Sequence, residues 1–192
     1  MSLSLPIRLD SKPAAVQATP VEELIRRCVE EDPRAQREFF NKHYRLILGI
    51  TSRYALDQQQ ARDFLNRSFL KAFNGLAQFR GEGEIGGWLR MITVNVCLAQ
   101  IRTKRNQSYA ELPETETEFQ APQALQQLAL EDLVGLIQQL PPVPRAVFNL
   151  TAVEGMSHRD VSLRLGIKET TSRYHLRQAR LRLQAAINHL NR

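Results

Sequence analysis

Residues 155–183 read GMSHRDVSLRLGIKETTSRYHLRQARLRL, the pattern of a short helix, a tight turn and a longer helix. Ser157 can cap the first helix, and Asp160, three residues later, can reach back to the cap in a capping box. Gly166 can end that helix because glycine readily adopts the left-handed backbone conformation of a tight turn. The pattern therefore predicts a helix-turn-helix.

The second helix of this pair is predicted from Glu169 to Leu190, with two unlike faces. Its inner face is predicted to hold Ser172, Leu176, Ala179 and Leu183. Its outer face is predicted to hold Thr170, Arg173, Tyr174, Arg177 and Arg180. A helix that binds the DNA major groove has this form, and so does an ordinary hairpin with a solvated arginine face. Residues 141–192 carry nine basic and three acidic side chains, and this excess favours DNA binding.

The net charge is unevenly distributed along the chain. The total of +6 at pH 7 consists of +1 in residues 1–61, +5 in 62–105, −6 in 106–140 and +6 in 141–192. Two basic blocks separated by an acidic one indicate two surfaces that can contact one polyanion. The alternative is that the acidic block pairs with the basic blocks inside one domain.

The composition is that of an ordinary globular chain, with 192 residues of which 43% are apolar, enough for one domain or two small ones. Cys28 and Cys97 are far apart and lack metal-binding spacing, so neither a disulfide framework nor a zinc site is expected. No signal peptide and no run of about 18 apolar residues is visible. We therefore expect a cytoplasmic protein.

The first half of the chain predicts a mobile tail and three helices. The tail covers residues 1–20, and the first helix covers 21–31. Asp32 and Pro33 are predicted to start the second helix, which reaches about Tyr54. Asp57 is predicted to cap the third, which reaches about Asn74. Its buried face is predicted from apolar residues that recur every three or four positions: Ala61, Phe64, Leu65, Phe69, Ala72, Phe73 and Leu76.

A glycine-rich segment, FRGEGEIGG at residues 79–87, precedes the fourth helix. It lacks the GK[ST] ending of a phosphate-binding loop and carries two glutamates, so it is predicted to be a flexible loop. The fourth helix is predicted from Trp88 to Arg105. Its basic end, residues 102–105, can either stabilise the helix dipole or contact phosphates, and the periodicity leaves both open.

The second half is predicted to follow a linker. Residues 106–124 contain two prolines and four glutamates, a composition typical of linkers. Periodicity then predicts a helix from Leu125 to Leu140 and another from Pro144 to Gly155, and no segment has a strand pattern. The predicted fold class is all-α, with two small helical domains at 21–105 and 125–192 joined by a flexible acidic linker.

The order of these features resembles a sigma factor of bacterial RNA polymerase, of the small extracytoplasmic-function (ECF) group, over about residues 21–188. In the first half the resemblance rests on the run DFLNRSFLKAF at 63–73, then Phe79-Arg80-Gly81, Trp88-Leu89 and Asn95. In the second half it rests on Leu140-Pro141, Arg145-Ala146-Val147-Phe148, Leu165-Gly166-Ile167, Leu176, Ala179 and Arg180. Each piece is short, and their shared order and spacing carry the identification.

The resemblance implies a protein that binds core RNA polymerase and directs it to promoters, with no catalysis and no cofactor of its own. The first domain, sigma region 2, would bind the coiled coil of the β′ subunit through Asp63, Asn66, Arg67, Leu70 and Lys71. It would open the −10 element through Phe79, Arg80, Trp88, Asn95, Arg102, Lys104 and Arg105. Trp88 could stack on a base, although its place on the apolar face of its helix favours core packing.

The second domain, sigma region 4, would bind the −35 element through Lys168, Thr170, Thr171, Arg173, Tyr174, Arg177 and Arg180. The implied partners are the β′ coiled coil and β flap of core polymerase, and promoter DNA. An anti-sigma factor that wedges against both domains is a common further partner in the group. The relative placement of the two domains stays open.

Two stretches depart from the family pattern. Asn66-Arg67 stands where members usually have Gln-Glu or Gln-Asp, which puts the strength of the β′ contact in question. The helix that begins near Lys168 lacks the usual serine cap, a loss worth about 1 kcal/mol. Ser172 in the same helix replaces a packing valine.

Two other functions stay open from the sequence. A stand-alone DNA-binding regulator that has lost polymerase binding would fit Asn66-Arg67. An enzyme would have to use scattered residues, none of which has metal-binding or nucleophile–base spacing: His43, His158, His175, Asp63 and Cys97. His43 itself is better interpreted as a structural residue of its helix.

Overall fold

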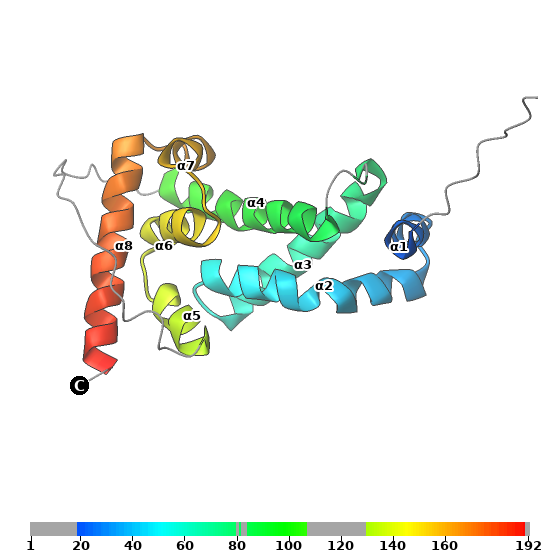
Figure 1. The fold of residues 1–192 in the computed structure, drawn as a ribbon, viewed down its shortest axis with the longest axis horizontal. Helices are drawn as coiled ribbons and strands as arrows, with labels where there is room; N and C mark the ends of the chain where they lie inside the picture. Colours follow the sequence, from blue (N-terminus) through cyan, green and yellow to red (C-terminus); the bar gives the residue numbers. More distant parts are fainter. Residues whose placement is uncertain (1–18, 80, 82–83, 107–129, 191–192) are drawn as a thin grey trace, which may run out of the picture.

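The computed structural model describes residues 19–79, 81, 84–106 and 130–190, and the regular elements in these ranges are all helical. In chain order they are α1 (Pro20–Val29), α2 (Pro33–Tyr54), α3 (Gln58–Gly75), the 3₁₀ turn η1 (Leu76–Gln78), α4 (Ile85–Asn106), α5 (Leu130–Gln138), α6 (Pro142–Phe148), the π-helical turn η3 (Asn149–Val153), α7 (His158–Leu165) and α8 (Glu169–Leu190) (Figure 1). The all-α fold class is confirmed. The predicted tail up to residue 18 and the predicted linker after Asn106 lie outside the described residues.

Capping residues set the helix starts in the first half. Thr19 accepts a hydrogen bond from the Glu22 N–H at 3.2 Å, and the Glu22 carboxylate accepts one from the Thr19 N–H at 2.6 Å, which completes a capping box for α1. Asp32 and Asp57 accept hydrogen bonds from first-turn N–H groups of α2 and α3 at 2.8 and 2.7 Å. The predicted starts at Asp32-Pro33 and Asp57 are confirmed.

Two predicted boundaries are wrong by a few residues. Helix α4 begins at Ile85 rather than Trp88, so Gly86 and Gly87 are helical and the loop is shorter than predicted. Ile85 packs against the first-half core, and this burial outweighs the poor helix propensity of the two glycines. Helix α6 begins at Pro142 rather than Pro144, because the first turn of a helix tolerates residues without an N–H.

Helices α1 to α4 surround one core of their own. Its most buried residues, each at most 4% exposed, include Phe39, Ile47, Leu65, Phe69 and Leu89. His43 is also buried, with its ring centroid 4.6 Å from that of Phe39. Burial lowers the pKa of His43, which favours a neutral ring, and the interpretation of His43 as a structural residue is confirmed.

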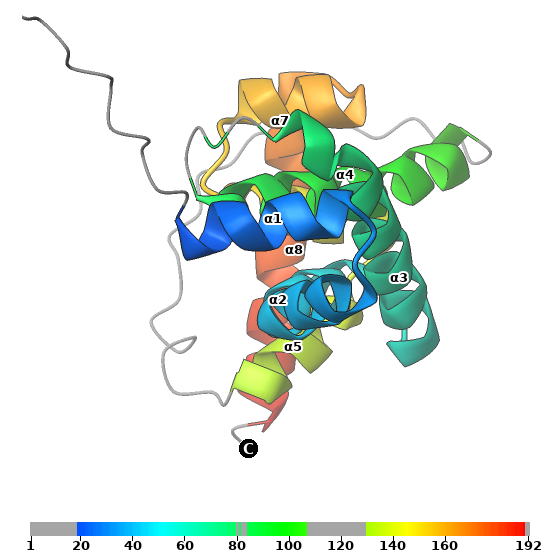
Figure 2. The same ribbon diagram turned by 90° about the vertical axis from the view of Figure 1, so that its right-hand side faces the viewer.

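A second core crosses from the first half of the chain into the second. It includes Ile50, Phe64, Val94, Leu98, Ile137, Leu150, Leu165 and Leu183. Helices α5 and α6 contact α2, and α6 and α7 contact α4. Figure 1 shows α8 standing across the end of the α2–α4 bundle, and Figure 2 shows it behind that bundle, at the far end from α1. The two halves therefore pack directly against each other, an arrangement that the sequence left open.

Both cysteines are buried as free thiols, Cys28 in α1 and Cys97 in α4. Burial raises the pKa of each thiol, so neither is an activated nucleophile. Within the described ranges, the helices are too short or too polar to cross a membrane. The same ranges bring no three metal-ligating side chains together.

Candidate nucleic-acid interface

Helices α7 and α8 form the predicted helix-turn-helix. Ser157 caps α7 by accepting a hydrogen bond from the Asp160 N–H at 3.2 Å, and Gly166 ends it in the left-handed conformation at φ 63°. The predicted capping box is wrong in one contact, because the Asp160 carboxylate accepts from the Ser157 hydroxyl at 2.6 Å instead of from the backbone. The predicted range of α8, Glu169–Leu190, is confirmed.

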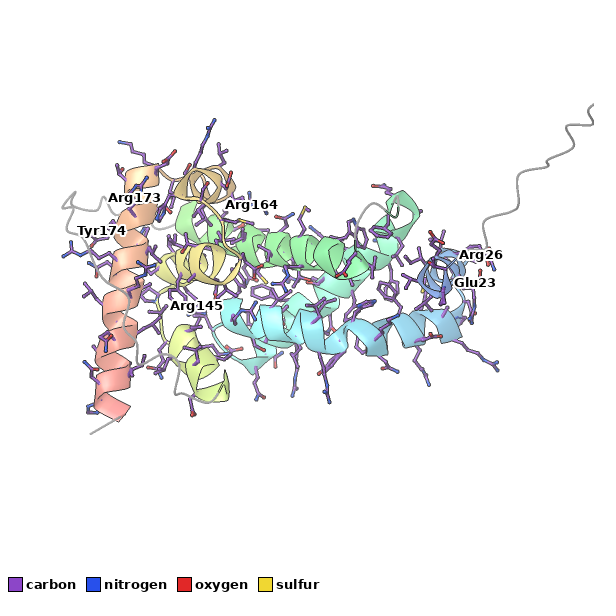
Figure 3. All side chains as sticks on the ribbon, in the orientation of Figure 1. Glu23, Arg26, Arg145, Arg164, Arg173 and Tyr174 are labelled. Atoms are coloured by element: carbon purple, nitrogen blue, oxygen red, sulfur yellow. The ribbon has the colours of Figure 1, made fainter. Side chains whose placement is uncertain are left out.

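The two predicted faces of α8 are confirmed as an inner and an outer face. The inner residues Ser172, Leu176, Ala179 and Leu183 are all buried. Of the predicted −35 residues, the exposed ones are Lys168, Thr170 and Arg173, and the half-buried ones are Thr171, Tyr174, Arg177 and Arg180. Arg173 and Tyr174 lie at the end of α8 nearest α7 (Figure 3). Among the predicted −35 residues, the exposed basic side chains are therefore those near the start of α8.

Arg173 is only loosely held within its own helix. Its guanidinium lies 3.8 Å from the Glu169 carboxylate, and the two side chains are 58% and 46% exposed. An exposed pair at this distance contributes little stability. The guanidinium of Arg173 can therefore exchange this carboxylate for a phosphate or a base edge at small cost.

The buried hydroxyl of Ser172 has a hydrogen-bond partner in the preceding helix, α7. The Ser172 hydroxyl and His158 Nδ1 are hydrogen-bonded at 2.9 Å, which ties the start of α7 to the first turn of α8. Burial, and then the nearby Arg173 and Arg180, lower the pKa of His158, which favours the neutral ring. A polar link thus stands at the position where the resemblance implies a packing valine. The sequence analysis missed it because the two residues are 14 positions apart.

His175 is a buried histidine on the inner side of α8. It is 8% exposed, and its Nδ1 has no hydrogen-bond partner among the described residues. Burial lowers its pKa to about 4. Folding therefore holds this ring neutral, whereas in the unfolded chain it gains a proton near pH 6.5.

We expect the free energy of unfolding to decrease as the pH falls from about 6.5 toward 4. In this range His175 is protonated in the unfolded chain but stays neutral in the folded one. At pH 4.5 the loss from this residue should be roughly 2 kcal/mol. Urea unfolding at a series of pH values measures it. His175→Leu should flatten the slope, whereas His189→Leu, on the exposed last turn of α8, should not. Equal slopes in both variants would contradict the assignment.

The predicted −10 residues lie on α4 and the loop before it. Trp88 is half-buried, and its ring centroid lies 5.5 Å from that of Phe79. A Cβ on Gly75 would lie 3.2 Å from the Trp88 ring, so the indole packs against the end of α3, as its periodicity favoured. Arg102 is exposed. Arg80 and the side chains of Lys104 and Arg105 lie outside the described residues.

Asn95 of α4 contacts the first helix of the helix-turn-helix. It is exposed on α4, and its Oδ1 accepts a hydrogen bond from Arg164 of α7 at 3.0 Å. A predicted −10 residue and the first helix of the predicted −35 reader are thus in direct contact. The sequence offered no signal for this pair, which is 69 residues apart.

The predicted polymerase-binding residues share one exposed face of α3: Asp63, Asn66, Arg67, Leu70 and Lys71. Leu70 is the apolar member of this group and is 63% exposed. The face lies opposite the buried stripe of the helix, so it stays accessible in the packed chain. Of the three predicted sets, the −10 set alone is brought by a described hydrogen bond to the other half of the chain, through Asn95 and Arg164 of α7.

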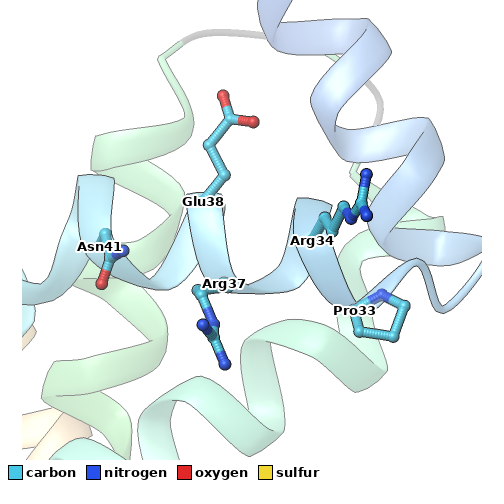
Figure 4. Close-up of a pocket in the computed structure, with 5 residues that line it drawn as sticks. All are labelled: Pro33, Arg34, Arg37, Glu38 and Asn41. Atoms are coloured by element: carbon cyan, nitrogen blue, oxygen red, sulfur yellow. The ribbon is translucent and has the colours of Figure 1, made fainter.

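A shallow hollow of about 510 Å³ lies on the first turns of α2 (Figure 4). It is lined by Pro33, Arg34, Arg37, Glu38 and Asn41. None of these belongs to a predicted site, and the five include no pair of nucleophile and base. The hollow therefore gives the enzyme hypothesis no support.

Two family models match the chain, one in each half. The model described as Sigma-70 region 2 matches residues 39–107, and that described as Sigma-70, region 4 matches residues 130–183. The RNA polymerase sigma-H factor of Pseudomonas aeruginosa is 27% identical over 184 residues, which cover 89% of this chain and 95% of that protein.

The ECF RNA polymerase sigma factor SigM of Mycobacterium tuberculosis is 27% identical over 172 residues, 88% of this chain and 85% of SigM. Among solved structures, the sigma factor RpoE in complex with the anti-sigma factor NepR from Bartonella quintana covers 81% of this chain and 99% of its own. That comparison has a TM-score of 0.47 and 19% identity.

Proposed function

Because the chain belongs to the sigma-70 family, we propose that it is a sigma factor that binds core RNA polymerase and directs the enzyme to specific promoters. The observation that carries this proposal is the presence of regions 2 and 4, in that order, on one chain. A stand-alone regulator is not favoured, because it would have no use for a retained region 2. The reaction belongs to the polymerase, and the chain supplies binding surfaces without a cofactor.

We assign region 2 to residues 21–105 and propose that the exposed face of α3 binds the β′ coiled coil. An exposed leucine among charged side chains can form the apolar centre and polar rim of a protein interface, and Leu70 has these surroundings. The loop and helix α4 would open the −10 element and hold the displaced strand, with Phe79 and Trp88 near the opened bases and Arg102 near phosphates.

We assign region 4 to residues 125–192 and propose that the start of α8 enters the major groove at the −35 element. The first residues of a recognition helix contact base edges in this type of motif, and here Lys168, Thr170 and Arg173 are exposed. Region 4 would also contact the β flap. An anti-sigma factor is a further proposed partner, and the place of action is the cytoplasm, where the polymerase works.

Arg67→Glu is expected to strengthen binding to the purified β′ coiled coil by about three- to tenfold. The change restores the acidic residue that the family usually carries at this point, and a charge at the rim of an interface acts through complementarity with its partner. Biolayer interferometry measures the affinity. Arg45→Glu, the same change on the exposed face of α2, is the matched control and should have no effect. Unchanged affinity of the Arg67→Glu variant would show that Arg67 does not lie in the interface.

The proposed function is tested by adding the purified chain to core RNA polymerase and following run-off transcription from a genomic promoter pool. Binding together with discrete start sites is the expected result, and alignment of the sequences upstream would show the −35 and −10 elements. A chain that binds core polymerase but yields no transcript from any promoter, or one that binds DNA but not polymerase, would overturn the proposal.

A further inference from the structure

The Ser172 hydroxyl fixes the orientation of the His158 imidazole. Ser172 is buried on the inner side of α8, and its Oγ lies 2.9 Å from His158 Nδ1. The two ring nitrogens of an imidazole point in nearly opposite directions, and each makes its own hydrogen bond. Because Nδ1 is held against a buried hydroxyl, the opposite edge of the half-buried ring, which carries Nε2, faces away from the core.

The outer edge of this ring lies beside the basic face of α8. Burial lowers the pKa of His158, and Arg173 and Arg180 are close enough to lower it further, whereas Glu169 acts in the opposite sense. Arg173 and Arg180 are two helical turns apart, so they lie on the same side of α8. His158 of α7 and two arginines of α8 therefore form one group of nitrogen donors, which we call the His158 cluster.

The other charged groups near the start of α7 already have partners or are exposed. Helix α7 packs against α8, α4 and η3. Arg90 of α4 and Glu154, directly after η3, pair with each other at 3.1 Å. On α7 itself the Asp160 carboxylate accepts from the Ser157 hydroxyl, Arg164 donates to Asn95, and Arg159 is exposed. An anion that reached the His158 cluster would thus meet three donors and the half-exposed carboxylate of Glu169.

We propose that Ser172 is a positioning residue for His158, and that the oriented imidazole binds a backbone phosphate of the DNA duplex through Nε2, beside Arg173 and Arg180. In the free chain the ring is neutral, because burial and two arginines oppose a further positive charge. A phosphate oxygen favours the imidazolium, so the ring takes up a proton from solvent when DNA binds. Affinity for DNA should therefore rise as the pH falls from about 8 toward 6.

The hydrogen bond between the two side chains is what makes this contact directional. A valine at position 172, which the resemblance implies, would pack against the ring but could not hold either nitrogen. A serine in the same place selects one ring orientation and leaves Nε2 for the ligand. The proposal rests on the proposed function for the assignment of α7 and α8 to DNA, but it does not depend on polymerase.

The test measures the affinity of the full-length chain for a random-sequence duplex at low salt by fluorescence anisotropy, at pH 6 and at pH 8. This probe suffices because a phosphate contact carries no sequence information. We expect the parent chain to bind roughly five- to tenfold more tightly at pH 6. His158→Gln can still accept from Ser172 and donate to a phosphate but carries no charge, so its affinity should be nearly the same at both pH values. His189→Gln, on the exposed last turn of α8, is the matched control and should keep the ratio of the parent.

The salt dependence separates a phosphate contact from a structural effect of the substitution. Each neutralised phosphate contributes about 0.9 to the slope of log affinity against log salt. In the parent the slope should be steeper at pH 6 than at pH 8 by up to about 0.9, whereas His158→Gln should have the same slope at both. Ser172→Ala removes the hydroxyl without adding bulk, and it should reduce both the pH dependence and the difference in slope.

A parent chain with equal affinity and equal slope at the two pH values, or one that does not bind the duplex at all, would overturn the proposal. So would a His158→Gln variant that keeps the pH dependence of the parent. Parent-like pH dependence in Ser172→Ala would refute the positioning role of the hydroxyl. Failure of the proposed function has a different signature, in which pH-linked duplex binding persists while run-off transcription yields no product.

Discussion

Arg145→Met is expected to lower the free energy of unfolding by about 3–5 kcal/mol. Methionine fills much of the same space but donates no hydrogen bond, so the carbonyls of Leu140, Tyr54 and Ala55 lose a donor in a buried site. Each buried acceptor left unpaired costs about 1–3 kcal/mol. Burial lowers the pKa of Arg145 because the buried guanidinium is desolvated. The methionine variant avoids this desolvation cost, and this offsets part of the stability lost with the hydrogen bonds.

Urea unfolding followed by circular dichroism measures the change. Arg145→Lys keeps the positive charge but cannot reproduce the planar set of donors, so its stability should lie between those of the parent and Arg145→Met. Arg182→Met, at an exposed position of α8, is the matched control and should change stability by less than about 0.5 kcal/mol. A similar stability for Arg145→Met and the parent would show that the guanidinium does not hold the α2 end.

The double variant Lys168→Ala with Arg173→Ala is expected to weaken binding of the polymerase complex to its −35 element by about 100- to 1,000-fold. Both side chains are exposed where α8 begins, the part of a recognition helix that reaches base edges. A good contact to a base contributes about 1–3 kcal/mol of discrimination, and two contacts on successive turns add. Electrophoretic mobility shift with the mapped promoter measures the loss.

The single variants separate base contacts from phosphate contacts. A side chain that contacts a phosphate contributes about 0.9 to the slope of log affinity against log salt and weakens all sequences alike. One that reads a base leaves the slope nearly unchanged and relaxes preference at one position. Arg182→Ala serves as the control on the same helix. Unaltered binding by the double variant would exclude the start of α8 as the −35 reader.

Features that depend on a few neighbouring residues were predictable from the sequence. Asp32, Asp57, Ser157 and Gly166 set the ends of their helices, because capping acts over two to four residues. The inner face of α8 was predictable because helical periodicity places Ser172 and Leu176 on one side. The exposed face of α3 was predictable for the same reason, because it lies on the side of the helix opposite the buried apolar residues.

The predictions that failed, and the contacts that were not predicted, depend on residues far apart in the sequence. Glycine propensity argued for a loop at Gly86 and Gly87, but both are helical because neighbouring side chains in α4 pack into the first-half core. The partners of Ser172 and Asn95 were not visible, since each lies in another helix. Asn66 and Arg67 lie on an exposed face of α3 and contribute nothing to its buried stripe. Their effect on polymerase binding is therefore tested by the affinity of the Arg67→Glu variant.

Helix order, most helix ends and the exposed faces of α3 and α8 follow from the order of side chains along the chain, because each depends on contacts within one or two turns. The packing of the two halves does not. Arg145 belongs to the sequence pattern that resembles the family, but nothing near it in sequence indicates its partners, and only the folded chain places it against carbonyls 90 and 91 residues away. A helix end accepts any well-placed donor, so its partner is selected by the packing of the shared core around Ile50 and Leu150 and not by local sequence.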